Sequence, residues 1–473
     1  MSSTTTLPAG RPLRLLHLGL GSFHRAHQAV YMHRLMRSGD ARWRCAAANL
    51  RPDMAEVVAA LREQGGAYTL ETVSPGGERA LEKITSISEV IPFEPGLSRV
   101  IELGADPDTR IVSFTVTEAG YALDHAGRLD LAHPEAASDL AGATSLTIYG
   151  AATAILRARR AAAAGPLTFM NCDNLRHNGD RFRANLRRFL EAAGDAGLLA
   201  WMEANTTCPN AMVDRITPRP ADDMKRRVAR QAGWDDKAAL MAESFIQWVI
   251  EDRFANGRPD WEKVGVEMTD DVQPYEEAKI RILNASHSAV AWAGILTGRT
   301  FIHEGARDPA IRRIAHDYVT DDVIPCLHRP GRESPVDLAS YRDVVLDRFG
   351  NEAIADTNQR VAADGFAKIP GFIAPTLRER LARGESVAAA ARLPALFLAF
   401  LNRWHRGRLP FDYQDQAMAP ERARAMLDAA DPLSAFVSDA SLWGDLAGSS
   451  ALRDAVAAAR TDLRGSIGDA AMG

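Results

Sequence analysis

The chain has 473 residues, of which 46% are hydrophobic and 25% charged, and its net charge is −5. This composition is ordinary for a globular protein, and the length is too great for one hydrophobic core, so we expect two domains. The small negative charge gives no argument for nucleic-acid binding, and no apolar run is long enough to cross a membrane. The four cysteines lack paired spacing, which favours free thiols in the cytoplasm and provides no zinc framework. Residues 1–16 lack the apolar core of a signal peptide and are expected to form a frayed tail.

The first motif follows a short apolar run at residues 13–18, which is typical of a buried strand. Helical spacing comes next, and the turn between contains Gly19 and Gly21. These match the first two glycines of a dinucleotide-binding turn, where one permits the tight turn and the other lets the backbone approach a pyrophosphate. His24 replaces the third glycine, so we expect helix and strand to pack slightly further apart. The residues predicted to bind a dinucleotide here are Gly19, Gly21, Ser22 and Phe23.

A second strand is predicted at residues 43–50, followed by a helix at residues 54–64. Dinucleotide-binding folds usually place a carboxylate on the ribose near the end of this strand, and Asp53 is the nearest candidate. A carboxylate here favours NAD, whereas Arg51, two residues earlier, leaves NADP open. Either residue could instead be a solvated charge in a loop.

Further strands are predicted at residues 110–116 and 167–170, and a polar cluster follows each of them. Ligands of doubly wound sheets bind at the carboxyl ends of the strands, so site residues are expected in these clusters. A turn-rich segment at residues 205–220 contains Asp214, which we expect to reach the same cleft.

The two halves of the chain differ in pattern. Strand-like segments end near residue 273, and the remainder is helical. We therefore predict an α/β protein with an N-terminal Rossmann-like, doubly wound domain at residues 1–273. A mostly α-helical substrate and catalytic domain is predicted at residues 274–473.

Residues 274–294 open with a proline and two glutamates and then run apolar, which predicts a largely buried helix. At about 100° per residue, Lys279, Asn284 and His287 would fall within an arc of about 140°. Burial would lower the pKa of the lysine and make it a general base, and the amide could donate to an alkoxide. The histidine could hold a hydroxyl. Each residue alone is more often structural, but three on one face favour a site.

A second polar cluster at residues 356–370 contains Arg360 and Lys368. Two cations could donate to the hydroxyls of a neutral polyol or balance the charge of a carboxylate substrate. The remaining C-terminal residues are expected to be packing helices.

Six segments together resemble the polyol-specific long-chain dehydrogenases of the mannitol 2-dehydrogenase family. They are GLGSFHRAH, FTVTEAGY, NCDNLRHNG, NTTCPNAMVDRITP, PYEEAKIRILNASH and DTNQRVAADGFAKIP. The resemblance implies metal-independent, NAD-dependent oxidation of a polyol to a ketose by a monomer, with D-arabinitol giving D-xylulose as the expected reaction. D-Mannitol oxidation and reduction of a uronate such as fructuronate or tagaturonate remain alternatives within the family. The turn AAANLRPD departs from the family's more glycine-rich, acidic version, so NADP is not excluded.

The resemblance also implies roles for individual residues. It makes Lys279 the general base, Asn174 and Asn284 the residues that hold the reacting oxygen, and His287 the residue that orients the substrate. Glu276 would influence the proton path of the base. The positions implied to lie near the substrate are Asp214, Arg360 and Lys368.

Two other classes of protein fit the sequence less well. A zinc-dependent polyol dehydrogenase would need clustered cysteine, histidine and glutamate ligands, and the scattered cysteines argue against it. A sugar-sensing nucleotide binder without catalysis would not need a buried lysine between two asparagines.

Overall fold

The computed structural model describes residues 11–124, 127–218 and 222–473. The first ten residues of the expected frayed tail, and residues 219 and 220 of the turn-rich segment, lie outside this part. Residues 13–16, which were included in that tail, begin a β-strand at Leu13 instead, so the prediction was wrong there. The chain forms two compact units. The first comprises the described residues up to Val73 together with Arg79–Gln273, and the second comprises Ser74–Glu78 with Pro274–Gly473.

The first unit is built on a parallel sheet, whose six strands in the described residues follow the order β5-β2-β1-β6-β7-β8. This is the 3-2-1-4-5-6 order of a Rossmann fold, and it confirms the predicted doubly wound fold class. The order reverses between β1 and β6. The strands are β1 (Leu13–Leu18), β2 (Trp43–Ala48), β5 (Ile87–Ile91), β6 (Thr109–Phe114), β7 (Leu167–Asn171) and β8 (Thr206–Thr207).

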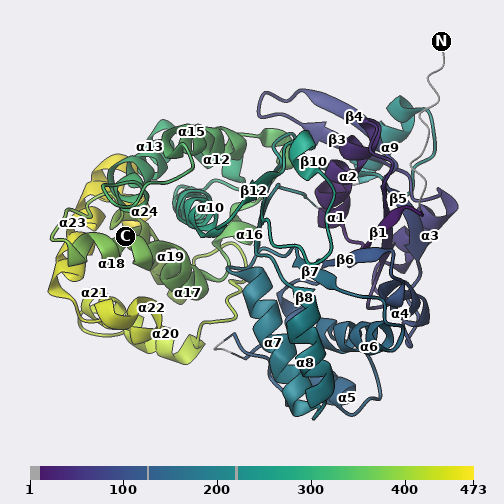
Figure 1. Ribbon diagram of the computed structural model, residues 1–473. Coiled ribbons are helices and arrows are strands. Elements are labelled where there is room, and N and C mark those ends of the chain that lie inside the picture. The colour runs from purple at the N-terminus through teal and green to yellow at the C-terminus, as the bar shows by residue number, and fades with distance from the viewer. Residues whose placement is uncertain (1–10, 125–126, 219–221) are drawn as a thin grey trace. The chain divides into compact units, whose positions relative to one another are not determined.

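Helices cover both faces of this sheet, so its strands are buried on both sides and read as apolar runs. Leu16 and Leu18 of β1 belong to the core beneath the helices drawn below the sheet in Figure 1, whereas Leu15 faces the core beneath α2. The first set comprises α4 (Ser98–Ala105), α5 (Pro134–Leu140), α6 (Ile148–Ala161), α7 (Asn178–Ala192) and α8 (Ala196–Asn205). The other helices include α1 (Ser22–Ala26), α2 (Gln28–Arg37), α3 (Ala55–Glu63) and α9 (Asp222–Ala232).

Two small sheets complete the first unit, and the sequence did not predict them. One has the order β10-β3-β4 and the other β12-β11-β9. Strand β9 lies inside the segment 205–220 that we predicted to be turns, and this prediction was wrong because a short strand between turn residues carries little periodicity. The strands are β3 (Tyr68–Val73), β4 (Arg79–Ile84), β9 (Ala211–Asp214), β10 (Leu240–Glu243), β11 (Gln247–Glu251) and β12 (Glu267–Thr269).

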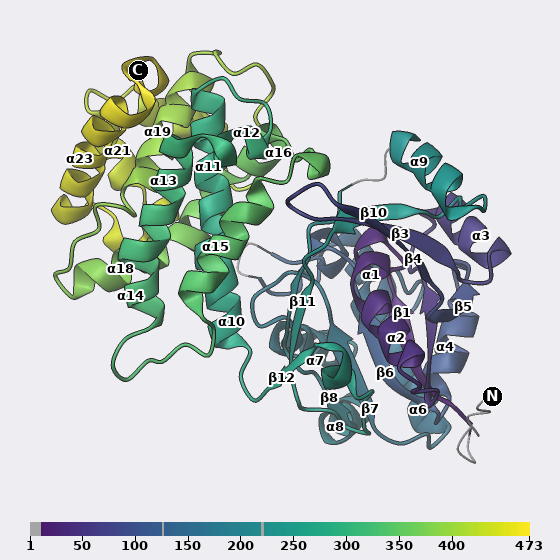
Figure 2. The same ribbon diagram turned by 90° about the horizontal axis from the view of Figure 1, so that it is seen from above.

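The second unit is helical, with α11 (Ala285–Leu296) among α12, α13, α16 and α19 (Figure 2). Gly294 of α11 lies so close to α16 that a Cβ would stand 2.4 Å from the Asn358 amide nitrogen. A larger residue would force these helices apart. The other helices are α10 (Gln273–Ala278), α12 (Ile302–Arg307), α13 (Pro309–Asp317), α14 (Ile324–Leu327), α15 (Leu338–Phe349), α16 (Asn358–Ala362), α17 (Gly365–Lys368), α18 (Ala374–Ala382), α19 (Arg392–His405), α20 (Pro420–Leu427), α21 (Pro432–Val437), α22 (Ala440–Trp443), α23 (Ser450–Ile467) and α24 (Asp469–Met472).

The single α-helix predicted for residues 274–294 is interrupted, so that prediction was wrong in its middle. A π-helical segment, Lys279–Asn284, separates α10 from α11. The i→i+5 bonding of a π-turn changes the angle between successive side chains, so the arc derived from 100° steps does not apply. Lys279 and Asn284 are the first and last residues of this segment, five positions apart, which is the span of one i→i+5 hydrogen bond.

Candidate active site

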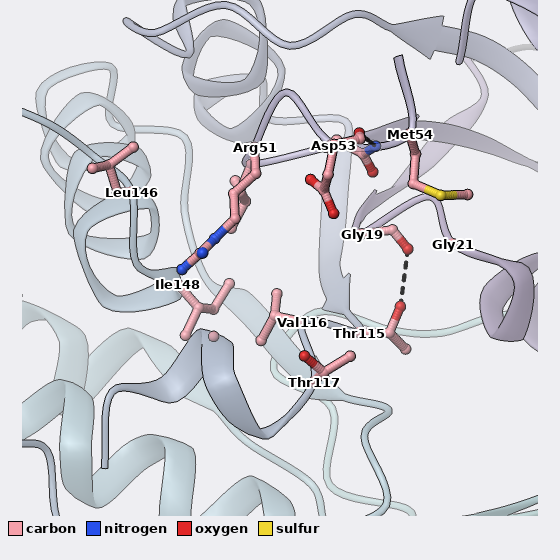
Figure 3. A pocket seen from close by; sticks show the side chains of 13 residues that line it. Gly19, Gly21, Arg51, Asp53, Met54, Thr115, Val116, Thr117, Leu146 and Ile148 are labelled. Atoms are coloured by element: carbon pink, nitrogen blue, oxygen red, sulfur yellow. Dashed lines mark hydrogen bonds between the residues drawn. The ribbon is translucent and has the colours of Figure 1, made fainter. Parts of the chain in front are cut away.

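A cavity of about 240 Å³ opens at the carboxyl ends of β1, β2 and β6, where the strand order reverses (Figure 3). Open α/β sheets bind their ligands at this position. The described lining residues are Gly19, Gly21, Asn49, Leu50, Arg51, Asp53, Met54, Thr115, Val116, Thr117, Gly120, Leu146 and Ile148.

Gly19 is required by its surroundings. Its φ is +105°, and a Cβ there would stand 2.0 Å from the carbonyl oxygen of Thr115 at the end of β6. The Thr115 hydroxyl donates to the Gly19 carbonyl at 2.9 Å, as drawn in Figure 3. Gly21 has an ordinary φ of −85° and its own Cβ position is open, so glycine here leaves space in the cavity. The two glycines therefore fit the close approach of a dinucleotide phosphate.

Asn49 ties the glycine turn to the turn after β2. Its side-chain oxygen accepts a hydrogen bond from Leu20 N at 2.7 Å, and its nitrogen donates to the Asp53 carbonyl at 3.3 Å. Sequence reasoning missed this residue, although an asparagine directly after a buried strand was an available signal.

Asp53 lines the cavity, as does Arg51, but their side chains point in different directions (Figure 3). The Arg51 guanidinium donates to the Glu135 carboxylate of α5 at 2.5 Å. Ser22 and Phe23 are not among the described residues that line the cavity. The Phe23 ring instead stacks on His27, with ring centroids 5.0 Å apart.

His24, which stands where the fingerprint has its third glycine, is buried against β1. Its ring stacks on His17 with centroids 3.5 Å apart, so two imidazoles fill the space between helix and strand. His17 Nε2 lies 3.1 Å from the Gly19 carbonyl oxygen, and Nδ1 lies 2.8 Å from the Ser113 hydroxyl. Burial lowers the pKa of His17 to about 3 and that of His24 well below its ordinary value, so both rings are neutral beneath the glycine turn.

Asn174 and Asp214 also belong to the first unit. Asn174 lies in the loop after β7, and Asp214 is the buried last residue of β9. The loop after β7 is fastened to the loop after β6 by Asp173, whose carboxylate accepts from Val116 N at 2.9 Å and from the Tyr121 hydroxyl at 2.5 Å. This places Asn174 beside the carboxyl end of the sheet.

In the second unit, Lys279 opens the π-helical segment and Asn284 closes it. Lys279 is only 6% exposed, and Glu276, one turn earlier on α10, is 5% exposed. A lysine and a glutamate are rarely buried to this degree without a role or a partner. The π-helical segment thus spans the two predicted residues Lys279 and Asn284, and α11 continues from it to His287.

His287 belongs to a polar cluster with Asp356 and Arg360. His287 Nε2 lies 3.4 Å from an Asp356 oxygen, and its ring stacks on Phe349 with centroids 4.5 Å apart. Arg360 Nε donates to the other Asp356 oxygen at 2.6 Å. Burial lowers the pKa of His287, partly offset by Asp356. Burial alone would raise the pKa of Asp356, but His287 and Arg360 hold it well below its usual range.

Lys368 lies near the same cluster. Its ammonium donates to the Val361 carbonyl at 2.6 Å, and burial lowers its pKa to about 8. The structure thus brings His287 and Arg360 together at Asp356, and it places Lys368 beside Val361, the residue after Arg360. Sequence reasoning missed Asp356, because its position within DTNQR does not reveal that two site residues converge on it.

Comparison with known proteins identifies the family. The model of the mannitol dehydrogenase Rossmann domain matches residues 13–263, and that of the mannitol dehydrogenase C-terminal domain matches residues 271–464. The chain belongs to the mannitol dehydrogenase family. The cavity lies in the residues matched by the Rossmann-domain model, and the polar cluster around Asp356 lies in those matched by the C-terminal-domain model.

Individual relatives narrow the activity. The chain is 61% identical to D-arabinitol 4-dehydrogenase of Ralstonia nicotianae over 94% of this chain and 95% of the relative. It is 55% identical to the Klebsiella pneumoniae D-arabinitol 4-dehydrogenase over 94% and 98%. The solved mannitol 2-dehydrogenase of Pseudomonas fluorescens, a ternary complex with NAD and D-mannitol, superposes with a TM-score of 0.81 at 35% identity, covering 98% of this chain and 94% of that chain. This protein is a polyol dehydrogenase, and its Rossmann domain points to a nicotinamide cofactor.

Three further features of the described residues bear on the site. None of their His, Cys, Asp and Glu side chains gather in a group of three or more suited to a metal ion. All four cysteines are buried free thiols. No helix among the described residues combines the length and apolarity needed to span a membrane.

Proposed function

We propose that this polyol dehydrogenase uses NAD to oxidise D-arabinitol at carbon 4, giving D-xylulose. The observation that carries the proposal is the 61% identity to a D-arabinitol 4-dehydrogenase over nearly the whole of both chains. The Asp53 carboxylate at the cavity supports NAD, because it can bond the ribose hydroxyls and repels a 2′-phosphate.

Lys279 is proposed as the general base that removes the hydroxyl proton. Its burial supports this role, because desolvation favours the neutral amine that can accept a proton. Glu276, one turn away and also buried, is proposed to influence the path by which that proton leaves. A bound nicotinamide supplies the redox chemistry by accepting hydride from the carbinol carbon.

Asn284 and Asn174 are proposed to donate hydrogen bonds to the oxygen on which negative charge develops. Fixed amide donors stabilise such an oxyanion without reorganising during the reaction. His287, which lies 3.4 Å from Asp356 and stacks on Phe349, is proposed to fix a neighbouring hydroxyl. Asp214 is proposed to contribute to substrate binding.

The charges around Asp356 favour a neutral polyol over a uronate. The Arg360 guanidinium is already engaged with the Asp356 carboxylate, and the Lys368 ammonium already donates to a backbone carbonyl and has a pKa of about 8. A substrate carboxylate would have to compete with Asp356 for Arg360. D-Mannitol is the second candidate substrate, since the solved relative at 35% identity is a complex with D-mannitol.

The test compares Lys279→Ala with the wild type by following reduced nicotinamide during D-arabinitol oxidation. We expect turnover to fall roughly 10²–10⁴-fold, the usual contribution of a general base, with NAD binding intact and partial rescue by added primary amines. Lys263→Ala is the matched control, because that lysine is a surface residue paired with Asp260. Wild-type turnover in Lys279→Ala would remove this lysine from the mechanism. Activity should also survive dialysis against a strong chelator, since no step requires a metal.

A further inference from the structure

Arg51 is the single cation among the described residues that line the dinucleotide cavity. It stands two residues before Asp53, in the turn where the adenosine ribose is read in a Rossmann fold. A guanidinium at this position normally accommodates the 2′-phosphate of NADP. Sequence alone therefore left the choice between the two cofactors open.

The structure shows that this guanidinium is already engaged. Arg51 Nη2 donates to Glu135 Oε2 at 2.5 Å, and both side chains are partly exposed, at 38% and 29%. Glu135 comes from a different part of the fold, the first turn of α5, which follows β6 in the chain. In Figure 3 the Arg51 side chain extends toward Ile148, while Asp53 points elsewhere in the cavity.

This ion pair has two consequences for a phosphate on the ribose. The phosphate would have to displace the Glu135 carboxylate before it could bond Arg51. The phosphate would also be repelled by the Asp53 carboxylate. Arg51 does not neutralise the charge of Asp53, because Arg51 is paired with Glu135. Both effects disfavour NADP and leave NAD unaffected.

We propose that Glu135 is a cofactor-specificity residue that holds Arg51 in an ion pair and so prevents it from binding the 2′-phosphate of NADP. The inference rests on the proposed use of NAD, and it adds a residue outside the β2 turn to the selectivity of the site. Glu135 acts through Arg51 and is a positioning residue.

The test measures the affinities of NADH and NADPH by calorimetry, which needs no substrate. We expect Glu135→Gln to lower the preference for NADH over NADPH by about fivefold, the scale of a partly exposed ion pair, through tighter NADPH binding. In an Asp53→Asn background the same substitution should tighten NADPH binding further, because freed Arg51 no longer has Asp53 as an alternative partner.

Arg51 supplies the decisive control. In an Arg51→Gln background, Glu135→Gln should have no effect on the preference, because no guanidinium remains to be released. Glu102→Gln, which removes a comparable surface pair with Arg99 at 2.8 Å, should leave the preference unchanged in every background. Thermal melts confirm that each variant is folded, and Glu135→Ala provides a second variant.

The inference would be overturned if Glu135→Gln left the preference for NADH over NADPH unchanged. It would also be overturned if the substitution changed this preference as much in the Arg51→Gln background as in the wild type. A wild type that binds NADPH more tightly than NADH would overturn both the inference and the proposed use of NAD. A wild type that binds NADH preferentially but does not oxidise D-arabinitol would reject the proposed substrate alone, and the calorimetric test would still stand.

Discussion

His287 Nε2 and Asp356 Oδ2 lie 3.4 Å apart, and the same carboxylate bonds the Arg360 guanidinium. Asp356 thus links two residues from different helices, with α11 on one side and α16 on the other. The stacking of His287 on Phe349 fixes the ring plane. The carboxylate therefore fixes the Arg360 guanidinium by hydrogen bonds and lies beside the His287 ring.

Asp356→Asn is expected to lower kcat/KM for the polyol roughly tenfold, mainly through KM, because an amide cannot hold Arg360 as a carboxylate does. Steady-state kinetics with saturating cofactor measure this. Asp445→Asn is the matched control, since it breaks an exposed pair with Arg378. Unchanged kinetics in Asp356→Asn would show that the link to His287 and Arg360 has no part in substrate binding.

The pKa of Lys368, lowered by burial to about 8, predicts a pH effect on substrate binding. Below pH 8 the side chain is protonated and can donate to a polyol hydroxyl, and above pH 8 it loses that charge. We expect KM for the polyol to rise between pH 8 and 9.5, and Lys368→Arg to abolish the rise because arginine stays protonated. A KM that is flat over this range in the wild type would exclude Lys368 from binding.

The stacked histidines predict acid sensitivity of the first unit. Burial lowers the pKa of His17 from 6.5 to about 3, so between these values the unfolded chain binds a proton that the folded chain does not. Stability therefore falls as pH decreases below 6.5, and His17 contributes about 2 kcal/mol of the loss by pH 5. Urea unfolding at pH 7.5 and pH 5 measures it, and His17→Gln should show a smaller loss. An equal loss in the variant would contradict the assignment to His17.

The sequence predicted those parts of the fold that produce long, simple patterns. Strands β1, β6 and β7 are rich in apolar residues because helices cover both faces of the sheet. Gly19 marks a turn whose φ and close contact with Thr115 exclude a Cβ. The short strands β8 and β9 have too few residues for a periodic signal.

The parts of the site that could not be predicted depend on tertiary structure. The residues from Lys279 to Asn284 form a π-turn, but their sequence is equally compatible with an α-helix. The change from i→i+4 to i→i+5 hydrogen bonding therefore cannot be predicted from the residue types. Asp356 and Glu135 each form an ion pair with a residue that the sequence did identify, but neither pairing follows from spacing. Asp356 engages the Arg360 guanidinium and Glu135 engages that of Arg51, so neither arginine is free to bind an anion without displacing its partner.

The most direct test of the proposed function is the ranking of kcat/KM under one set of conditions. The substrates are D-arabinitol, D-mannitol, ribitol and xylitol with NAD, and D-fructuronate in the direction of reduction. A site that bonds each hydroxyl should reject epimers, because a misplaced hydroxyl leaves buried groups unpaired at about 1–3 kcal/mol each. We predict the highest value for D-arabinitol, with D-xylulose as the product, and much lower values for ribitol and xylitol. A higher value for D-mannitol or D-fructuronate than for D-arabinitol would contradict the proposed substrate.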